Sequence, residues 1–198
     1  MNTGSKFAKL SVADYLSGEQ DARQRHEYVE GSVYMMVGGT NAHNRIATNA
    51  TVVLGGQLKG HPCQMFNSDT KVRIRTRTGT RFYYPDAMVA CDVNPDHDVF
   101  QDAPVLLIEV LSPGTRRTDD TEKKDAYLSV DSLKVYLLVE RSTAEARVYR
   151  RTESGFEVEH YAGLEAIIPL PEIDCQLAFA ELYEDVRFEE EPESTEMK

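Results

Sequence analysis

The longest regular pattern of apolar positions predicts a helix over residues 42–58. Apolar side chains recur there at the spacing of one helix face, at Ala42, Ile46, Ala50, Val53, Leu54 and Leu58. Thr40 or Asn41 can cap its first turn, and Gly60-His61-Pro62 ends it. A shorter helix is expected over residues 12–16, where Ser11 and Asp14 are typical of a cap and an acidic first turn.

Shorter runs between turn residues predict strands. We expect a hairpin from residues 26–29 and 32–37 around the turn pair Glu30-Gly31, and another turned at Glu153-Ser154-Gly155. Further strands are expected over residues 64–66, 71–77, 81–91 and 167–170, with a short helix near 177–183.

Residues 104–111 and 135–139 are apolar on both faces, as in central strands covered on both sides. Between them, Asp119, Asp120 and Glu122 suit the first turn of a helix running to about Leu128. This order predicts an α/β fold with a mixed β-sheet flanked by helices.

Length and charge limit the possible domain organisation and the way in which nucleic acid could be bound. The 198 residues favour one domain over residues 1–185, followed by an acidic tail over 186–198 that we expect to be disordered. The net charge of −11 argues against a protein that holds nucleic acid by bulk positive charge. Eight acids and two bases from Glu181 onward account for −6, which leaves −11 + 6 = −5 for residues 1–180.

The sequence favours a cytoplasmic protein with no membrane partner. No apolar run approaches the roughly 20 residues of a spanning helix, and residues 1–10 lack the apolar segment of a secretion signal. Cys63, Cys91 and Cys175 are odd in number and far apart, so we interpret them as small buried residues in a reducing compartment.

Glu109 is the charge inside the apolar run of residues 105–111. Burying an unpaired carboxylate is costly, so Glu109 must meet a cation, accept strong hydrogen bonds, lie at the open end of the strand or stay protonated. A salt bridge to an arginine such as Arg116 is one alternative; a functional site is the other.

Asp86 follows Pro85 at the start of an expected strand. A Pro-Asp pair alone more often marks a turn or strand edge. Asp86 and Glu109, however, could lie at the ends of neighbouring strands and converge on one point. Two carboxylates placed in this way suit a hard cation such as Mg²⁺.

Six segments match the pattern of a known family: Glu27-Tyr-Val-Glu-Gly31, Ala42-His43, Tyr84-Pro-Asp86, Ile108-Glu-Val-Leu-Ser-Pro-Gly-Thr-Arg116, Glu122-Lys123 and Ser132-Leu-Lys-Val-Tyr-Leu-Leu-Val139. Through them the chain resembles the bacterial Uma-two-type endonuclease family, within the restriction-endonuclease-like superfamily marked by the PD-(D/E)xK motif. The resemblance covers roughly residues 10 to 185. It implies a restriction-endonuclease-like fold and metal-dependent hydrolysis of phosphodiester bonds, with DNA as the expected nucleic acid.

The resemblance also implies a site. Asp86 and Glu109 would bind Mg²⁺ or Mn²⁺ together with the backbone carbonyl of Val110. The superfamily motif has lysine two residues after the glutamate, where this chain has Leu111. Lys123 matches the position to which the lysine has moved, and we expect it, rather than Lys124, to point at the strand end with Tyr127.

Three further residues match the family. Glu27 could add a metal ligand or orient water, or could instead be an exposed hairpin residue paired with Arg25. His43 is kept as a catalytic candidate beside its alternative as a packing or capping residue. Arg116 could contact phosphate. The implied reaction is in-line attack of activated water on phosphorus, with Lys123 positioning the nucleophile or offsetting charge.

A basic stripe offers a nucleic-acid contact. Lys71, Arg73, Arg75 and Arg77 alternate with other residues, so a strand would place all four on one face. We expect contacts to the phosphate backbone; the alternative is a solvated face whose cations balance nearby acids.

Two rival functions stay open. The fold could have lost catalysis and serve as a module that binds nucleic acid or protein, which the absent lysine at 111 and the negative charge favour. A metal hydrolase that does not act on nucleic acid could use the same site. A homodimer is compatible with either function.

Overall fold

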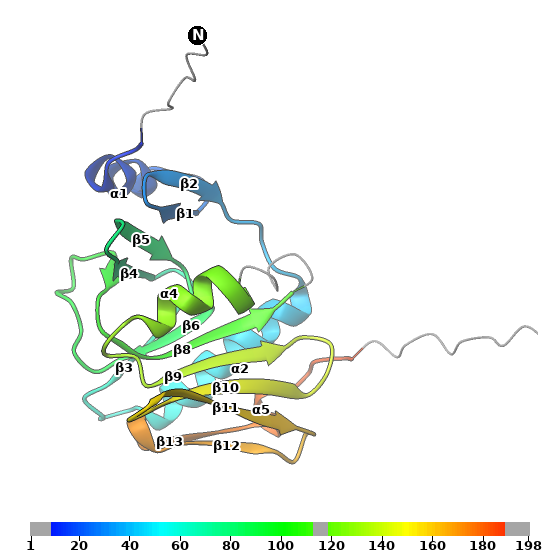
Figure 1. Cartoon of the computed structure of the whole chain (residues 1–198). Helices are drawn as coiled ribbons and strands as arrows, with labels where there is room; N and C mark the ends of the chain where they lie inside the picture. The colour runs from blue at the N-terminus through cyan, green and yellow to red at the C-terminus, as the bar shows by residue number, and fades with distance from the viewer. Residues whose placement is uncertain (1–8, 113–118, 189–198) are drawn as a thin grey trace, which may run out of the picture.

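The computed structural model describes residues 9–112 and 119–188. Two sheets dominate it, with strand orders β2-β1-β5-β4-β7 and β11-β10-β9-β8-β6-β3, and a small third sheet pairs β12 with β13. Figure 1 shows the five-stranded sheet with α1 at one end of the molecule and the third sheet at the other. The expected mixed α/β architecture is confirmed.

The six-stranded sheet contains the strands that were expected to be central. β8 (Pro104–Leu111) runs parallel to β9 (Val135–Glu140), and the sheet's other neighbours are antiparallel. Its remaining strands are β3 (Gln64–Asn67), β6 (Ala87–Ala90), β10 (Glu145–Thr152) and β11 (Gly155–Ala162). The two-residue turn between β10 and β11 lies where the sequence predicted it.

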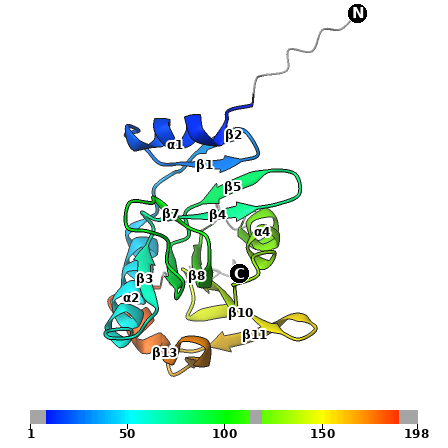
Figure 2. The ribbon, with the colours of Figure 1, turned by 90° about the vertical axis from the view of Figure 1, so that its left-hand side faces the viewer.

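Both faces of this sheet are covered, as the apolar runs predicted. One face packs against α2 (Asn41–Gln57) through Ile46, Ala50 and Leu54. The other packs against α4 (Lys124–Leu128) and the five-stranded sheet. Figure 2 shows α2 and α4 on opposite sides of β8.

The five-stranded sheet begins with the expected hairpin. β1 (His26–Val29) and β2 (Ser32–Met35) are joined by Glu30 and Gly31, whose φ angles of 51° and 101° are the positive values that tight hairpins need. β4 (Lys71–Arg75), β5 (Thr80–Tyr83) and β7 (Phe100–Gln101) complete the sheet. The basic strand therefore ends at Arg75, before Arg77.

The single strand expected over residues 81–91 was wrong. β5 ends at Tyr83 in one sheet, and β6 begins at Ala87 in the other. Pro85 lies between them, and proline has no N–H to donate to a ladder. The chain therefore passes from sheet to sheet immediately before Asp86.

The remaining elements differ from expectation mainly at their ends. α1 (Val12–Gln20) is capped by Ser11, whose Oγ accepts from the Asp14 amide, and Thr40 caps α2. A π-helical turn, η1 (Asp119–Lys123), precedes α4. The last helix, α5 (Phe179–Leu182), is shorter than expected. It follows β12 (Ile167–Leu170), η2 (Pro171–Ile173) and β13 (Cys175–Ala178).

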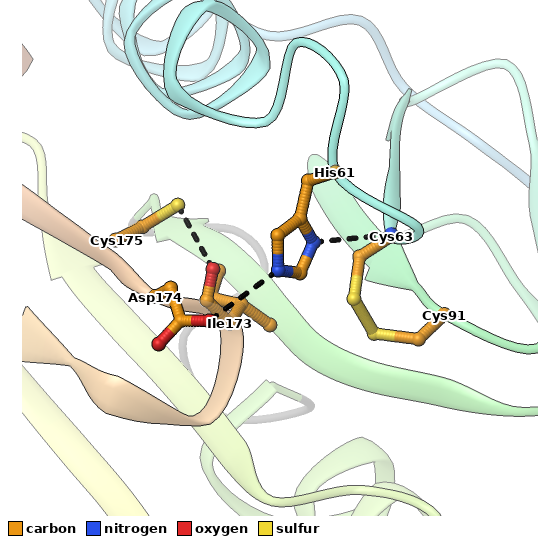
Figure 3. The surroundings of a disulfide bond; sticks show 6 residues. All are labelled: His61, Cys63, Cys91, Ile173, Asp174 and Cys175. Carbon is orange, nitrogen blue, oxygen red and sulfur yellow. Dashed lines mark hydrogen bonds and ion pairs between the residues drawn. A yellow bond between two sulfur atoms is a disulfide. The ribbon is translucent and has the colours of Figure 1, made fainter.

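The expectation of unpaired cysteines was wrong for two of the three. Cys63 and Cys91 form a disulfide, while Cys175 is a free thiol whose Sγ donates to the Ile173 carbonyl (Figure 3). Gln64 pairs with Ala90 in the β3–β6 ladder, so Cys63 and Cys91 lie opposite each other one step further along. A separation of 28 residues in sequence gives no sign of this pairing.

Two boundary findings complete the fold. Val186 and Phe188 pack against the core beside Tyr183, so contacts with the core reach past residue 185.

Among the residues that the structure describes, no helix is long and apolar enough to cross a membrane.

Candidate functional site

Glu109 lies near the carboxyl end of β8 and is 4% exposed. Its neighbours Leu107 and Leu111 belong to the apolar face that α4 and the five-stranded sheet cover. The Tyr127 hydroxyl donates a hydrogen bond of 2.9 Å to Glu109 Oε1. Burial and the negative charge of Glu109 raise the pKa of Tyr127 well above its usual range, so this hydroxyl keeps its proton. The sequence-based expectation that a buried glutamate must be compensated is confirmed.

Lys123 points at the same carboxylate. Its Nζ lies 3.8 Å from Glu109 Oε1 and 2.8 Å from Glu27 Oε1, and the residue is 6% exposed. Lys124 turns elsewhere, with its Nζ over the Tyr149 ring. The geometric prediction that Lys123, and not Lys124, faces the strand end is confirmed. Its part in catalysis stays a prediction.

Glu27 is not an exposed hairpin residue paired with Arg25. Its side chain is 14% exposed and reaches Lys123 from β1. Arg25 instead pairs with Asp69 at 3.0 Å. The β1–β2 hairpin therefore brings a second carboxylate into the cluster, because β1 pairs with β5 above α4 (Figure 1).

Tyr83 closes this side of the cluster. The Lys123 Nζ lies 5.7 Å from the centre of its ring, and its hydroxyl donates to Glu122 Oε1 at 3.4 Å. Burial, with the charge of Glu122, raises the pKa of Tyr83 to about 12. Sequence reasoning had not singled out this tyrosine, since aromatic residues in a strand usually indicate core packing.

Asp86 reaches the same end of the sheet from the start of β6. Because Ala87 pairs with Ile108, Asp86 lies beside Glu109 one residue further on. Asp86 Oδ2 accepts a hydrogen bond of 2.7 Å from the Val110 amide. This bond ties the carboxylate to the backbone of β8.

His43 approaches Asp86 from the first turn of α2. Its Nε2 lies 3.2 Å from Asp86 Oδ2, and the imidazole is 14% exposed. Burial opposes charging of the ring, but the hydrogen bond to Asp86 and the charge of that carboxylate outweigh it and raise the pKa of His43. Its amide also donates to the capping Thr40 hydroxyl. His43 thus combines the capping position with a contact to the candidate site.

The donor types present suit a hard divalent cation. Asp86, Glu109 and the Val110 carbonyl offer oxygen ligands on adjacent strands, and Mg²⁺ is commonly bound by one or two carboxylates with waters. Over residues 9–112 and 119–188, no group of three or more His, Cys, Asp or Glu side chains is placed to hold a metal. The expected set has two such side chains and stays a prediction.

The basic stripe does not form one exposed surface. Lys71 is 5% exposed. Arg73 donates to Asp102 through Nε, at 2.7 Å, and stacks on Phe100. Arg75 has a side chain 64% exposed, 3.4 Å from Asp102, and Arg77 lies exposed in the turn. Arg116, the fifth expected nucleic-acid contact, lies outside the described residues.

The family comparison decides what kind of protein carries this cluster. The model of the Uma2 family, described as "Putative restriction endonuclease", matches residues 12–180. The chain belongs to the Uma2 family. The matched segment contains Glu27, His43, Asp86, Glu109 and Lys123, so the resemblance inferred from the sequence is confirmed.

Two similar proteins come from a Synechocystis strain, and both are called uncharacterized. One is 35% identical over 151 residues, which is 75% of this Uma2 chain and 78% of the relative. The other is 28% identical over 145 residues, which is 72% of this chain and 81% of the relative.

A solved structure confirms the restriction-endonuclease-like fold. It is described as "a putative nuclease belonging to DUF820" from Anabaena variabilis, and it matches with a TM-score of 0.65 and 20% identity. The match covers 82% of this chain and 92% of that one. The Uma2 family description supports a nuclease-like function for this chain.

Proposed function

We propose that this Uma2 protein hydrolyses phosphodiester bonds in DNA and uses Mg²⁺ or Mn²⁺. Two contacts at the end of β8 support the proposal. Lys123 Nζ lies 3.8 Å from Glu109 Oε1, and Asp86 accepts a hydrogen bond from the amide of Val110, the next residue. Asp86 immediately precedes β6, Glu109 lies in β8, and Lys123 ends the η1 turn before α4. Lys123 is almost fully buried between the carboxylates of Glu27 and Glu109. A structural role does not need two strand-end carboxylates and a buried lysine in one place.

Each protein group has a task in the proposed reaction. Asp86, Glu109 and the Val110 carbonyl would hold the cation, which supplies Lewis-acid polarisation of a phosphate oxygen and a lowered pKa for water. The Val110 amide fixes the orientation of Asp86, and Tyr127 fixes that of Glu109. These bonds preset the carboxylates before a cation or substrate arrives.

Lys123 supplies positive charge beside the reacting phosphate. Glu27 holds its ammonium at 2.8 Å, so the lysine cannot turn into solvent without leaving a buried carboxylate unpaired. The ammonium would position the attacking water and offset the charge that develops on phosphorus-bound oxygens. His43 would act on Asp86 as a positioning residue.

Cleavage of three nucleic acids tests the proposal. Supercoiled plasmid, single-stranded DNA and RNA are incubated with the protein in Mg²⁺, Mn²⁺ or EDTA. We expect nicking or linearisation of plasmid with either cation and none in EDTA. Asp86→Asn and Glu109→Gln should each lower the cleavage rate at least about a hundredfold, which is the usual effect of losing a group that stabilises charge in the transition state.

Binding of the cation is measured separately. Titration calorimetry should show Mn²⁺ binding to the wild-type protein and weaker binding to Asp86→Asn, with a rise in Tm that follows occupancy. A protein that binds no cation at millimolar concentration, or whose affinity is unchanged in Asp86→Asn, contradicts the metal site.

A non-catalytic module that binds nucleic acid or protein is the second candidate. Leu111 stands where the superfamily motif has lysine, and this observation favours it. Binding of DNA by the wild-type protein, with no cleavage of any of the three substrates in either cation, would establish this function instead.

A further inference from the structure

A cavity of about 230 Å³ lies on the far side of β5 from the candidate site. Tyr83 turns toward Lys123, and the next residue, Tyr84, turns toward α1, where its hydroxyl donates to Glu19. The cavity lies between α1, the segment after it and the start of β4. Its charged lining residues are Glu19, Arg25, Asp69 and Lys71, and the Tyr84 ring lies among them.

Lys71 is the unusual member of this lining. It is 5% exposed, yet within the described part of the chain its ammonium has no hydrogen bond or ion pair. Its Nζ faces the Tyr84 ring, whose centre lies 4.9 Å away. Burial lowers the pKa of Lys71, and the charge of Glu19 offsets this in part. The side chain is buried and lines the cavity, so an acceptor for its ammonium would bind inside the cavity.

Glu19 does not fill that role, because other donors already hold it. Its Oε1 accepts from the His26 amide at 2.7 Å and from the Tyr84 hydroxyl at 2.9 Å. Its Oε2 lies 3.1 Å from His26 Nδ1. The carboxylate is thus fixed in the wall by its own set of bonds and does not reach Lys71 within ion-pair distance.

Arg25 adds a second cation at the cavity. Its guanidinium lies 5.8 Å from the centre of the same Tyr84 ring that faces Lys71. Arg25 also donates to the Ser68 carbonyl and pairs with Asp69, but its side chain is 44% exposed, so part of the guanidinium faces solvent. Two cations beside one ring, one buried and one accessible, suit a ligand with more than one negative charge.

We propose that this cavity binds a phosphate monoester group, with Lys71 at its base and Arg25 at its mouth. Lysine binds phosphate as a point charge, and arginine binds it through its planar fork of donors. The volume exceeds what one phosphate needs and falls below the roughly 300 Å³ of pockets that enclose whole ligands. The rest of the ligand therefore lies outside. The site lies apart from Asp86 and Glu109 and does not depend on cleavage by them.

Calorimetry with two simple probes tests the site. Inorganic phosphate and a nucleoside 5′-monophosphate are titrated into the full chain in EDTA, at an ionic strength held constant with chloride. We expect saturable binding that Lys71→Met weakens by about tenfold or more, the scale of one charge-assisted hydrogen bond. The control is Lys59→Met, which changes an exposed lysine at the end of α2 and should bind like the wild type. Absence of saturable binding, or equal binding by Lys71→Met, overturns the proposal and assigns the cavity to water.

A measurement on the wild-type protein guards against misfolding of the variant. Reductive methylation of lysines, read by mass spectrometry, should slow at Lys71 when phosphate is present and stay unchanged at Lys59. Equal slowing at both lysines, or none at Lys71, counts against the site. Lys71→Met should itself unfold at the wild-type temperature or above, because it removes a buried charge that has no ion pair among the described residues.

Oligonucleotides identify the source of the phosphate. In a Glu109→Gln background, oligonucleotides with a 5′-phosphate or a 5′-hydroxyl are compared. A preference for the 5′-phosphate that Lys71→Met removes assigns the site to a nucleic-acid end. Equal binding of the two, with retained binding of the monophosphate, assigns it to a free nucleotide or phosphate. Failure of the nuclease proposal would leave both outcomes unaffected.

Discussion

Lys123 illustrates how one side chain can serve stability and chemistry together. It lies between Glu27 and Glu109, and both carboxylates are largely buried. Removing its charge would leave two buried acids facing each other, which is costly by a few kcal/mol. The same ammonium is the positive charge that we propose acts on the reacting phosphate.

We therefore predict two losses in Lys123→Met. The cleavage rate should fall by roughly a hundredfold, and the midpoint of unfolding should fall as well. Lys124→Met, which changes the adjacent lysine over Tyr149, should affect neither strongly. Plasmid cleavage below the unfolding temperature and thermal denaturation are the measurements. Equal effects of the two substitutions would contradict the assignment.

The ion pair of Asp102 with Arg73 should make the free energy of unfolding depend on pH. Burial alone would raise the pKa of Asp102, but hydrogen bonds from Arg73 and Asn94 lower it below 3.8. A carboxyl with a lowered pKa in the folded state stabilises the protein above its unfolded pKa. That contribution is lost as the pH falls through the folded value.

Asp102→Asn should therefore be less stable than the wild type at pH 7, and the gap should close below about pH 4. Urea unfolding between pH 7 and pH 3 measures both proteins. A gap that stays constant over this range would show that Asp102 contributes through packing rather than charge.

Glu109 was predictable from the sequence alone, because it interrupts an apolar run. Lys123, Glu27 and His43 were chosen on the family resemblance, and helix periodicity then placed Lys123 and Tyr127 on one face. Asp102 and Glu19 could not be predicted as partners of Arg73 and Tyr84. Such pairs depend on which loops meet in space, and periodicity carries no information on that.

At the scale of elements, the central strands and α2 were predictable, because their apolar patterns are long and regular. The division of residues 81–91 into β5 and β6 was not, since both parts have strand character and the sheet to which each belongs is a tertiary choice. The pairing of Cys63 with Cys91 followed from that choice, through the β3–β6 ladder.

The disulfide should make a measurable contribution. It closes a loop over 28 residues, and the chain-entropy estimate for such a loop is about 3 to 4 kcal/mol. Replacing Cys63 and Cys91 with alanine should lower the free energy of unfolding by an amount of this order, and a reductant should do the same to the wild type. Cys175→Ser is the control and should change little. Unfolding midpoints that do not respond to reductant would show that the bond adds no stability.

At the scale of the whole molecule, the proposed binding of DNA has to be reconciled with a net charge of −11, and we expect exposed basic residues near β4 to make the contacts. Arg73 is engaged with Asp102, which leaves Arg75 and Arg77 as the accessible members of the stripe. We predict that replacing both with serine weakens DNA binding and flattens its salt dependence by roughly one unit per lost phosphate contact.

The comparison is made by fluorescence anisotropy with labelled DNA over a range of salt concentrations. Mn²⁺ affinity, measured in parallel, should not change, because neither arginine contacts Asp86 or Glu109. An unchanged salt slope would assign the stripe to a solvated face.

The order in which successive strands join the two large sheets bears on how the protein unfolds. After β1 and β2 in the five-stranded sheet, the chain adds β3 to the six-stranded sheet. It then adds β4 and β5 to the first sheet, β6 to the second and β7 to the first. From β8 to β11 it stays in the six-stranded sheet. Neither sheet is built from one continuous stretch of chain, so we expect the two sheets to unfold together. Hydrogen exchange in β1 and in β9 should accordingly report the same global opening, and denaturation should follow one cooperative transition whichever sheet is observed.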